Sequence, residues 1–148
     1  MSDLNAGRSE KTPSILIVSG HPCDRHWLVQ ELRTFGWTCG IAETVDAALD
    51  ALGGADATFL VICEQSLPDG DWRDLLIRTT GDTGQPLLIV TSTHADDRLW
   101  VEVLNLGGFD VLMKPFDRIE LCRVMQMALR HWEFRRATSV TAVEYGQG

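Results

Sequence analysis

Residues 14–18 read Ser-Ile-Leu-Ile-Val, a continuous apolar run that is rich in branched side chains. Such a run is typical of a strand that is covered on both faces of a parallel sheet, because no polar residue alternates with the apolar ones. Four more runs of this kind follow, and we expect five strands in all. The predicted strands cover residues 14–18, 37–42, 58–63, 87–91 and 110–113.

Segments with a helical spacing of apolar residues separate these strands. One helix is expected over residues 26–35, before Gly36, and a short one over 45–52 with Thr44 as its N-cap. The last helix is expected to begin at Asp117, with Glu120 completing a capping box. The two remaining helices are expected over residues 72–80 and 95–106.

This alternation predicts an α/β fold: a flavodoxin-like, doubly wound, five-stranded parallel sheet of the (βα)5 type in a single domain. We expect the domain over residues 14–136, after a flexible N-terminal segment, 1–13, and before a flexible C-terminal tail, 137–148. In such sheets ligands bind beyond the carboxyl ends of the strands. The functional site is therefore expected among the residues that follow the strands.

The composition narrows the classes of function. The chain has 148 residues, 45% of them hydrophobic, and a formal net charge of −8 at pH 7. An acidic surface repels phosphate backbones, so we expect no nucleic-acid partner. We expect no membrane partner and a cytoplasmic location, because no apolar run is long enough for a span or a secretory signal. The cysteines lack a C-x-x-C spacing and are interpreted as buried thiols: Cys23, Cys39, Cys63 and Cys122.

Short motifs follow the predicted strands in a fixed order. They are Pro22 after the first strand, Leu-Pro-Asp-Gly-Asp at 67–71 after the third, Thr91-Ser92 after the fourth, and Leu-Gly-Gly-Phe-Asp at 106–110 before Lys114-Pro115-Phe116. Any one of these motifs is a weak signal. Together, and in this order, they resemble the receiver domain of two-component response regulators over about residues 14–136.

The resemblance implies a site that takes a phosphoryl group from a histidine kinase. Receivers accept it on an Asp at the end of the third strand and bind Mg²⁺ with the help of two acidic residues after the first strand. In this sequence Glu64 stands at the acceptor place, and Ser19 and Gly20 stand at the two acidic places. One carboxylate beside a lysine needs no cation, and the longer Glu64 side chain misplaces the carboxylate for in-line transfer. We therefore expect a degenerate pseudo-receiver without Mg²⁺, another metal or a cofactor.

Three further residues match the receiver motif. Thr91 stands at the place of its hydroxyl, and Lys114 and Pro115 stand at the places of its ion-pairing lysine and the following proline. Glu64 and Lys114 are expected to form a close pair, which either imitates the phosphorylated state in part or is an ordinary ion pair. Val111 stands where many receivers carry an aromatic rotor, so the usual switch is expected to be missing.

The resemblance also implies a binding face on the helix at 95–106, the strand at 110–113 and the last helix. We expect a histidine kinase or another signalling protein, or a second copy of this chain, to bind there. The expected face comprises Asp97, Arg98, Trp100, Val101, Glu102, Asp110, Val111, Arg118 and Arg123. Opposite charges on the two helices suit a two-fold dimer.

The function predicted from the sequence is a stand-alone receiver-like domain in phosphorelay signalling, which acts through protein contacts and has no catalytic residues or enzyme activity. Two alternatives stay open: a working phospho-accepting receiver, and a small flavodoxin-like ligand-binding protein or enzyme. The histidines lack metal-ligand spacing and are interpreted as surface residues: His21, His26, His94 and His131. Three indoles are expected to be buried: Trp37, Trp72 and Trp100.

Overall fold

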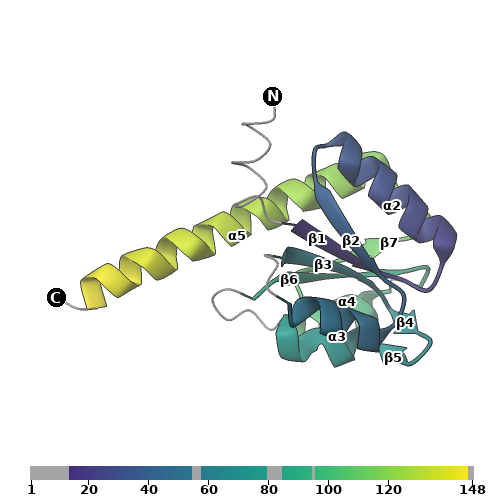
Figure 1. The fold of residues 1–148 in the computed structure, drawn as a ribbon, viewed down its shortest axis with the longest axis horizontal. Helices are drawn as coiled ribbons and strands as arrows, with labels where there is room; N and C mark the ends of the chain where they lie inside the picture. The colour runs from purple at the N-terminus through teal and green to yellow at the C-terminus, as the bar shows by residue number, and fades with distance from the viewer. Residues whose placement is uncertain (1–13, 55–57, 80–84, 95, 147–148) are drawn as a thin grey trace.

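The computed structural model describes residues 14–54, 58–79, 85–94 and 96–146. Five parallel strands form one sheet in the order β2-β1-β3-β6-β7 (Figure 1). The strands are β1 (Ser14–Val18), β2 (Thr38–Ala42), β3 (Thr58–Glu64), β6 (Leu87–Ser92) and β7 (Asp110–Met113). This order is that of flavodoxin-like sheets, and the predicted fold class is therefore confirmed.

The two central strands, β3 and β6, are covered on both faces of the sheet. β3 pairs with β1 on one side and with β6 on the other. Its side chains are buried from Phe59 to Glu64, and every side chain of β6 is buried. A strand covered on both faces requires the continuous apolar sequence that these segments carry. β2, at the edge of the sheet, is mostly exposed.

Helices cover both faces of the sheet (Figure 1). One face carries α2 (Pro22–Thr34) and α5 (Arg118–Gly146). The other carries α3 (Val45–Leu52), the 3-10 helix η1 (Trp72–Arg78) and α4 (Asp97–Asn105). A short antiparallel pair, β4 (Ser66–Leu67) and β5 (Gly70–Asp71), lies between β3 and η1.

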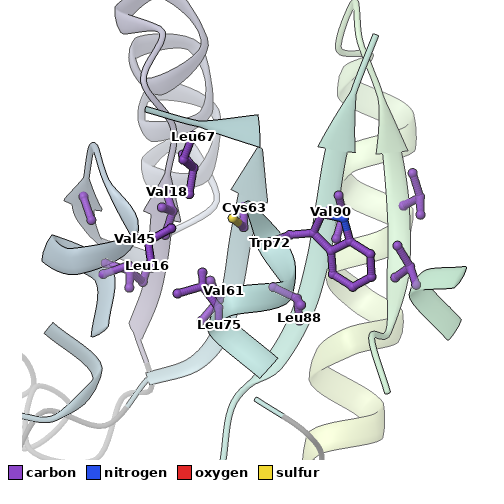
Figure 2. Packing of buried hydrophobic residues seen from close by; sticks show 14 of the residues in the cluster. Leu16, Val18, Val45, Val61, Cys63, Leu67, Trp72, Leu75, Leu88 and Val90 are labelled. Carbon is purple, nitrogen blue, oxygen red and sulfur yellow. The ribbon is translucent and has the colours of Figure 1, made fainter. Parts of the chain in front are cut away.

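Each face of the sheet has its own hydrophobic core. Alternate residues of β3 point to opposite faces, so that Val61 belongs to one core and Ile62 to the other. Trp72, which is fully buried, is the largest side chain of the core beneath η1 and α4, and Figure 2 shows its ring beside Val90 of β6. On the opposite face, side chains such as Leu32 of α2 pack against the sheet.

Several helix boundaries differ from those expected. α2 begins at Pro22 rather than at residue 26, because a proline at the first helical position loses no intrahelical hydrogen bond. The segment expected as a helix over 72–80 is the 3-10 helix η1. α5 continues to Gly146, through most of the expected tail, since no proline or glycine interrupts residues 118–145. Among the described residues, no helix is long and apolar enough to cross a bilayer.

The expected burial of thiols and indoles is only partly correct. Cys63 is buried in β3, but Cys23 is exposed in the first turn of α2. Trp72 is fully buried, whereas Trp100 on α4 is 48% exposed. The buried side chains of α4 are Leu99 and Val103, and the indole next to them in sequence falls outside this stripe.

Candidate functional site

Four strands bring polar side chains to one edge of the sheet. Ser19 follows β1, Glu64 ends β3, Thr91 lies near the end of β6, and Lys114 follows β7. The register places Glu64 directly beside Thr91. The carboxyl ends of the strands thus form a polar crevice around Glu64, at the place where this fold binds its ligands.

Glu64 is only 8% exposed, and both of its carboxylate oxygens are engaged. Oε1 accepts hydrogen bonds from the Ser19 hydroxyl at 3.0 Å and from the Gly20 backbone N–H at 3.2 Å. Oε2 lies 3.1 Å from Lys114 Nζ and 2.8 Å from His21 Nε2. The residues after β1 therefore present donors to Glu64, at the two places where the receiver motif would have acidic side chains.

Lys114 lies between two carboxylates, and the peptide bond that joins it to Pro115 is cis. Its ammonium donates to Asp24 Oδ2 at 2.8 Å and to Glu64 Oε2 at 3.1 Å. Burial lowers the pKa of Lys114, but the hydrogen bonds and the charges of Asp24 and Glu64 outweigh burial and hold this pKa above its ordinary value. The expected pairing of Glu64 with Lys114 is therefore confirmed, and the ammonium is charged.

The sequence did not predict two contacts of the site, those of Asp24 and of His21. Asp24 lies closer to Lys114 than Glu64 does, so Glu64 is neither the nearest counter-charge of the lysine nor the only carboxylate of the crevice. His21 has an exposed side chain, as expected, but its ring also contacts Glu64. The signal for Asp24 is its place in the first turn of α2, which the expected helix start at residue 26 concealed.

Thr91 takes no part in the hydrogen bonding of the Glu64 carboxylate, whose contacts come from the residues after β1 and from Lys114. Its backbone carbonyl accepts from the Gln65 N–H at 2.8 Å. The neighbouring Ser92 hydroxyl donates to Gln65 Oε1 at 2.6 Å. The segment after β3 is thus fastened to the end of β6 through Gln65, a residue that the motif did not single out.

The same segment is joined to helices on both of its sides. The Asp69 carboxylate accepts from the backbone N–H groups of Val45 at 2.7 Å and Asp46 at 3.0 Å, which lowers the pKa of Asp69. Arg73 donates to Glu102 of α4, with 2.9 Å between Nε and Oε2, and its guanidinium lies 5.1 Å from the centre of the Trp72 ring. These contacts connect the surroundings of the crevice to α3 and α4.

The structure brings together only part of the expected binding face. The Trp100 indole N–H donates to Asp110 Oδ1 at 3.2 Å, which places the ring beside β7. Glu102 is directed to Arg73 on η1. Arg118 pairs with Glu31 of α2, with 2.7 Å between Nε and Oε1, because α2 and α5 pack side by side on the same face of the sheet. Arg118 therefore lies on the α2 side of α5, away from α4.

A groove of about 440 Å³ lies between α4, β7 and the start of α5. Trp100, Val111 and Met113 give it an apolar lining. Carboxylates at the N-terminal ends of both helices surround this lining: Asp96, Asp97, Asp117 and Glu120. Arg118 and Arg123 of α5 do not line this groove, and the expected pairing of an acidic and a basic helix across a two-fold dimer stays a prediction.

The residues of the crevice do not fit Mg²⁺, which the receiver motif implies. Mg²⁺ is held by oxygen atoms that act as ligands, mostly from carboxylates, water and phosphates. The Ser19 hydroxyl and the Gly20 N–H instead donate to Glu64, and Lys114 supplies the positive charge. Throughout the described parts of the chain, no group of three His, Cys, Asp or Glu side chains could hold a metal ion.

The family model of the response regulator receiver domain matches residues 15–126. The chain belongs to this family. It is 38% identical over 109 residues to the transcriptional regulatory protein PmrA of Pectobacterium parmentieri, and 33% identical over 103 residues to the transcriptional regulatory protein FixJ of Bradyrhizobium diazoefficiens. These alignments cover 72% and 69% of this chain, and 48% and 49% of the two relatives. The receiver domain thus spans about half the length of the curated relatives it matches.

Solved receiver structures have the same fold. The signal receiver domain of an HD domain-containing protein from Pseudomonas fluorescens Pf-5 has a TM-score of 0.73 and 29% identity, over 82% of this chain and 97% of that one. The signal receiver domain of a putative Luxo repressor protein from Vibrio parahaemolyticus has a TM-score of 0.77 and 20% identity, over 85% and 96%. The second likeness supports the fold alone.

Proposed function

We propose that this receiver domain is a pseudo-receiver, which acts in phosphorelay signalling through protein contacts and independently of phosphorylation. The observation that carries the proposal is the exchange of acceptors for donors in the crevice. A phospho-accepting receiver needs oxygen ligands for a cation after β1, whereas Ser19 and Gly20 donate to Glu64 at 3.0 and 3.2 Å. The charges of Glu64 and Lys114 balance each other without a metal ion.

The contacts of Glu64 also oppose phosphoryl acceptance. Attack on phosphorus needs an accessible carboxylate oxygen in line with the leaving group, and a positive charge to stabilise the transferred oxygens. Oε1 has two donors, and Oε2 contacts both Lys114 and His21. Transfer would break some of these contacts at a buried carboxylate.

The charges around Lys114 support a constitutive state. A phosphorylated side chain carries about −1.5 to −2 charges at pH 7, and a single carboxylate carries only about −1. Here Lys114 contacts Asp24 as well as Glu64, at 2.8 and 3.1 Å. Two carboxylates thus hold the ammonium without any phosphoryl group, and we infer that Lys114 is permanently engaged.

The α4 side of the domain is expected to keep one arrangement. Val111 is buried in β7 and is too short to alternate between an inward and an outward position as an aromatic ring does. Trp72 belongs to the same core as Leu99 and Val103 of α4. Arg73, stacked on Trp72, holds Glu102 of α4. With α4 held by core packing and by this ion pair, the binding face would not depend on a chemical signal at the crevice.

We infer that the partner binds at the groove between α4, β7 and α5. Trp100 is half exposed there, and carboxylates of both helices surround the apolar lining. Such a groove fits an apolar side chain flanked by Lys or Arg on a histidine kinase or another signalling protein. In titrations against purified histidine kinases from the organism that encodes this chain, Trp100→Ala should weaken binding at least about tenfold. Ile77→Ala, which removes an exposed apolar side chain from η1, should not.

Phosphoryl acceptance is the experiment that tests the proposal. The wild type should gain no phosphoryl group when it is incubated with acetyl phosphate and Mg²⁺ and its intact mass is measured by mass spectrometry. A matched variant carries Ser19→Asp, Gly20→Asp and Glu64→Asp, which restores three carboxylates. A side chain at Gly20 fits, because its Cβ would meet Pro68 at an ordinary 3.5 Å. Phosphorylated wild type whose adduct disappears in Glu64→Gln would refute the proposal and identify a working receiver.

A further inference from the structure

β2 is an edge strand: in the part of the chain that the structure describes, it lies at one end of the sheet and pairs only with β1. The Ala42 carbonyl accepts from the Ser19 N–H, so the backbone polar groups of Ala42 point toward β1. Because these directions alternate along a strand, the N–H and C=O groups of Cys39 and Ile41 point outward.

The sequence of β2 does not block the addition of another strand. Natural edge strands are commonly protected by lysine, proline or a bulge. β2 reads Thr-Cys-Gly-Ile-Ala and follows β1 in an unbroken register, and Ile41 is 53% exposed. The opposite edge differs, because β7 begins with Asp110 and Lys114 follows it. β2 is therefore the edge that is open to pairing.

We propose that β2 pairs in antiparallel fashion with the β2 of a second copy of this chain, around a two-fold axis at Gly40. In this register Cys39 of one copy lies opposite Ile41 of the other, and each such pair exchanges two N–H···O=C hydrogen bonds. Gly40 lies opposite its own symmetry mate at the narrow, non-hydrogen-bonded position. No side chain hinders the approach there, and the two sheets become one.

Charges at the two ends of β2 favour a second copy over an unrelated strand. Arg33 lies in the last turn of α2, near the start of β2. Burial raises the pKa of the Cys39 thiol to about 11, and the nearby charge of Arg33 opposes this rise. Glu43 follows the other end of β2; its Oε1 lies 3.7 Å from Arg25 Nη1 of the same chain, and its side chain is still 68% exposed, so that it can also face a second copy. An antiparallel copy brings the Glu43 end of each strand to the Arg33 end of the other, so that two opposite-charge contacts form by symmetry.

The proposed dimer leaves the groove at α4 accessible. β2 and β7 are the two opposite edges of the sheet, and the groove adjoins β7. The pairing of β2 therefore does not compete with a partner at Trp100. It also does not depend on whether Glu64 accepts a phosphoryl group, so this inference and the pseudo-receiver proposal can fail separately.

Sedimentation equilibrium over a wide concentration range tests the pairing. The mass of the wild type should rise from 16.5 kDa toward twice that value. Ile41→Lys places a charge on the pairing edge and should leave a monomer. Glu43→Arg should raise the dissociation constant about tenfold, and combining it with Arg33→Glu should restore the dimer, because the charges are then exchanged. Trp100→Ala, at the other edge of the sheet, should leave the dissociation constant of the dimer unchanged.

A wild type that stays monomeric at all concentrations would overturn the inference. So would a dimer that tolerates both Ile41→Lys and Glu43→Arg, or one that Trp100→Ala abolishes. Thermal unfolding at low concentration checks that each variant folds. If Ile41→Lys does not fold, the charge exchange between Arg33 and Glu43 decides alone. Amide exchange gives a second readout, since the Cys39 and Ile41 amides should be protected only when the dimer forms.

Discussion

Glu64 and Asp69 are both carboxylates held by donors near the end of β3, but their surroundings differ. Glu64 is buried and contacts a lysine from the end of β7. Asp69 is exposed and accepts from two backbone N–H groups at the start of α3. When a buried charge loses its partner, water cannot reach it and the charge stays unpaired. When an exposed charge loses its donors, water replaces them. Similar hydrogen-bond geometry therefore predicts very different effects on stability.

The largest effect is expected at the buried cluster. Lys114→Met leaves the Asp24 and Glu64 carboxylates without their shared cation and should lower the free energy of unfolding by about 3–5 kcal/mol. Urea denaturation at pH 7 measures this loss. Because the pKa of Lys114 lies above its ordinary value, this stabilisation is complete below the ordinary lysine pKa and is lost as the pH rises through the folded-state pKa.

A double-mutant cycle tests whether Glu64 and Lys114 act as a pair. Glu64→Gln alone should cost less than Lys114→Met, since Asp24 remains at 2.8 Å from the ammonium. The double variant should be more stable than the sum of the two single losses predicts, because neither group is then left unpaired. Strictly additive losses would show that the contact has no energetic coupling.

A smaller effect is expected from the hydrogen bond that Ser19 donates to Glu64. Ser19→Ala removes a buried donor to a charged acceptor, and the free energy of unfolding should fall by about 1.5–3 kcal/mol. Ser92→Ala is the matched control, because Ser92 is also buried but donates to the neutral Gln65. If the two variants lose equal stability, the charge of the buried Glu64 carboxylate does not strengthen its hydrogen bond with Ser19.

At Asp69 we expect a modest fall in melting temperature on replacement by alanine and a smaller one on replacement by asparagine, which keeps one acceptor oxygen. The pKa of Asp69 is lowered, so its stabilisation is present above the ordinary carboxyl pKa and is lost as the pH falls through the folded-state value. Thermal melts between pH 7 and pH 2 would measure it. Asp50→Ala, an exposed change within α3, is the control, and an equal fall there would contradict a capping role for Asp69.

The smallest effect is expected at the exposed pair of Arg73 and Glu102. Glu102→Gln should lower the free energy of unfolding by no more than about 1 kcal/mol, and added salt should reduce the difference. The more informative readout is the amide exchange of α4, which should accelerate if this contact holds the helix against η1. Unchanged exchange across α4 would mean that Trp72 and the core hold the helix without help from the ion pair.

The sequence predicted the strands and the pairing of Glu64 with Lys114 because both depend on simple rules. Strands covered on both faces need continuous apolar runs, and residues at the carboxyl ends of neighbouring parallel strands lie together. The register of β3 with β6 and of β6 with β7 then places the two side chains at one crevice.

The remaining contacts of the site depend on details that periodicity does not carry. Asp24 reaches Lys114 because α2 starts at Pro22, earlier than the apolar spacing suggested. Arg118 pairs with Glu31 because α2 and α5 lie on the same face of the sheet. The sequence alone does not show whether Arg118 pairs within the chain or with another protein. Trp72 is buried because it lies on the side of η1 that packs against the core, and Trp100 is exposed because it lies outside the buried side of α4.

Isothermal titration with Mg²⁺ distinguishes a crevice built of hydrogen-bond donors from one that offers cation ligands. The wild type should show no saturable binding up to millimolar Mg²⁺. The variant with Ser19→Asp and Gly20→Asp should bind, since the two added carboxylates and Glu64 then need a divalent cation to relieve their repulsion. Saturable binding by the wild type at millimolar or lower concentrations, lost in Glu64→Gln, would show instead that the crevice of the wild type is a Mg²⁺ site.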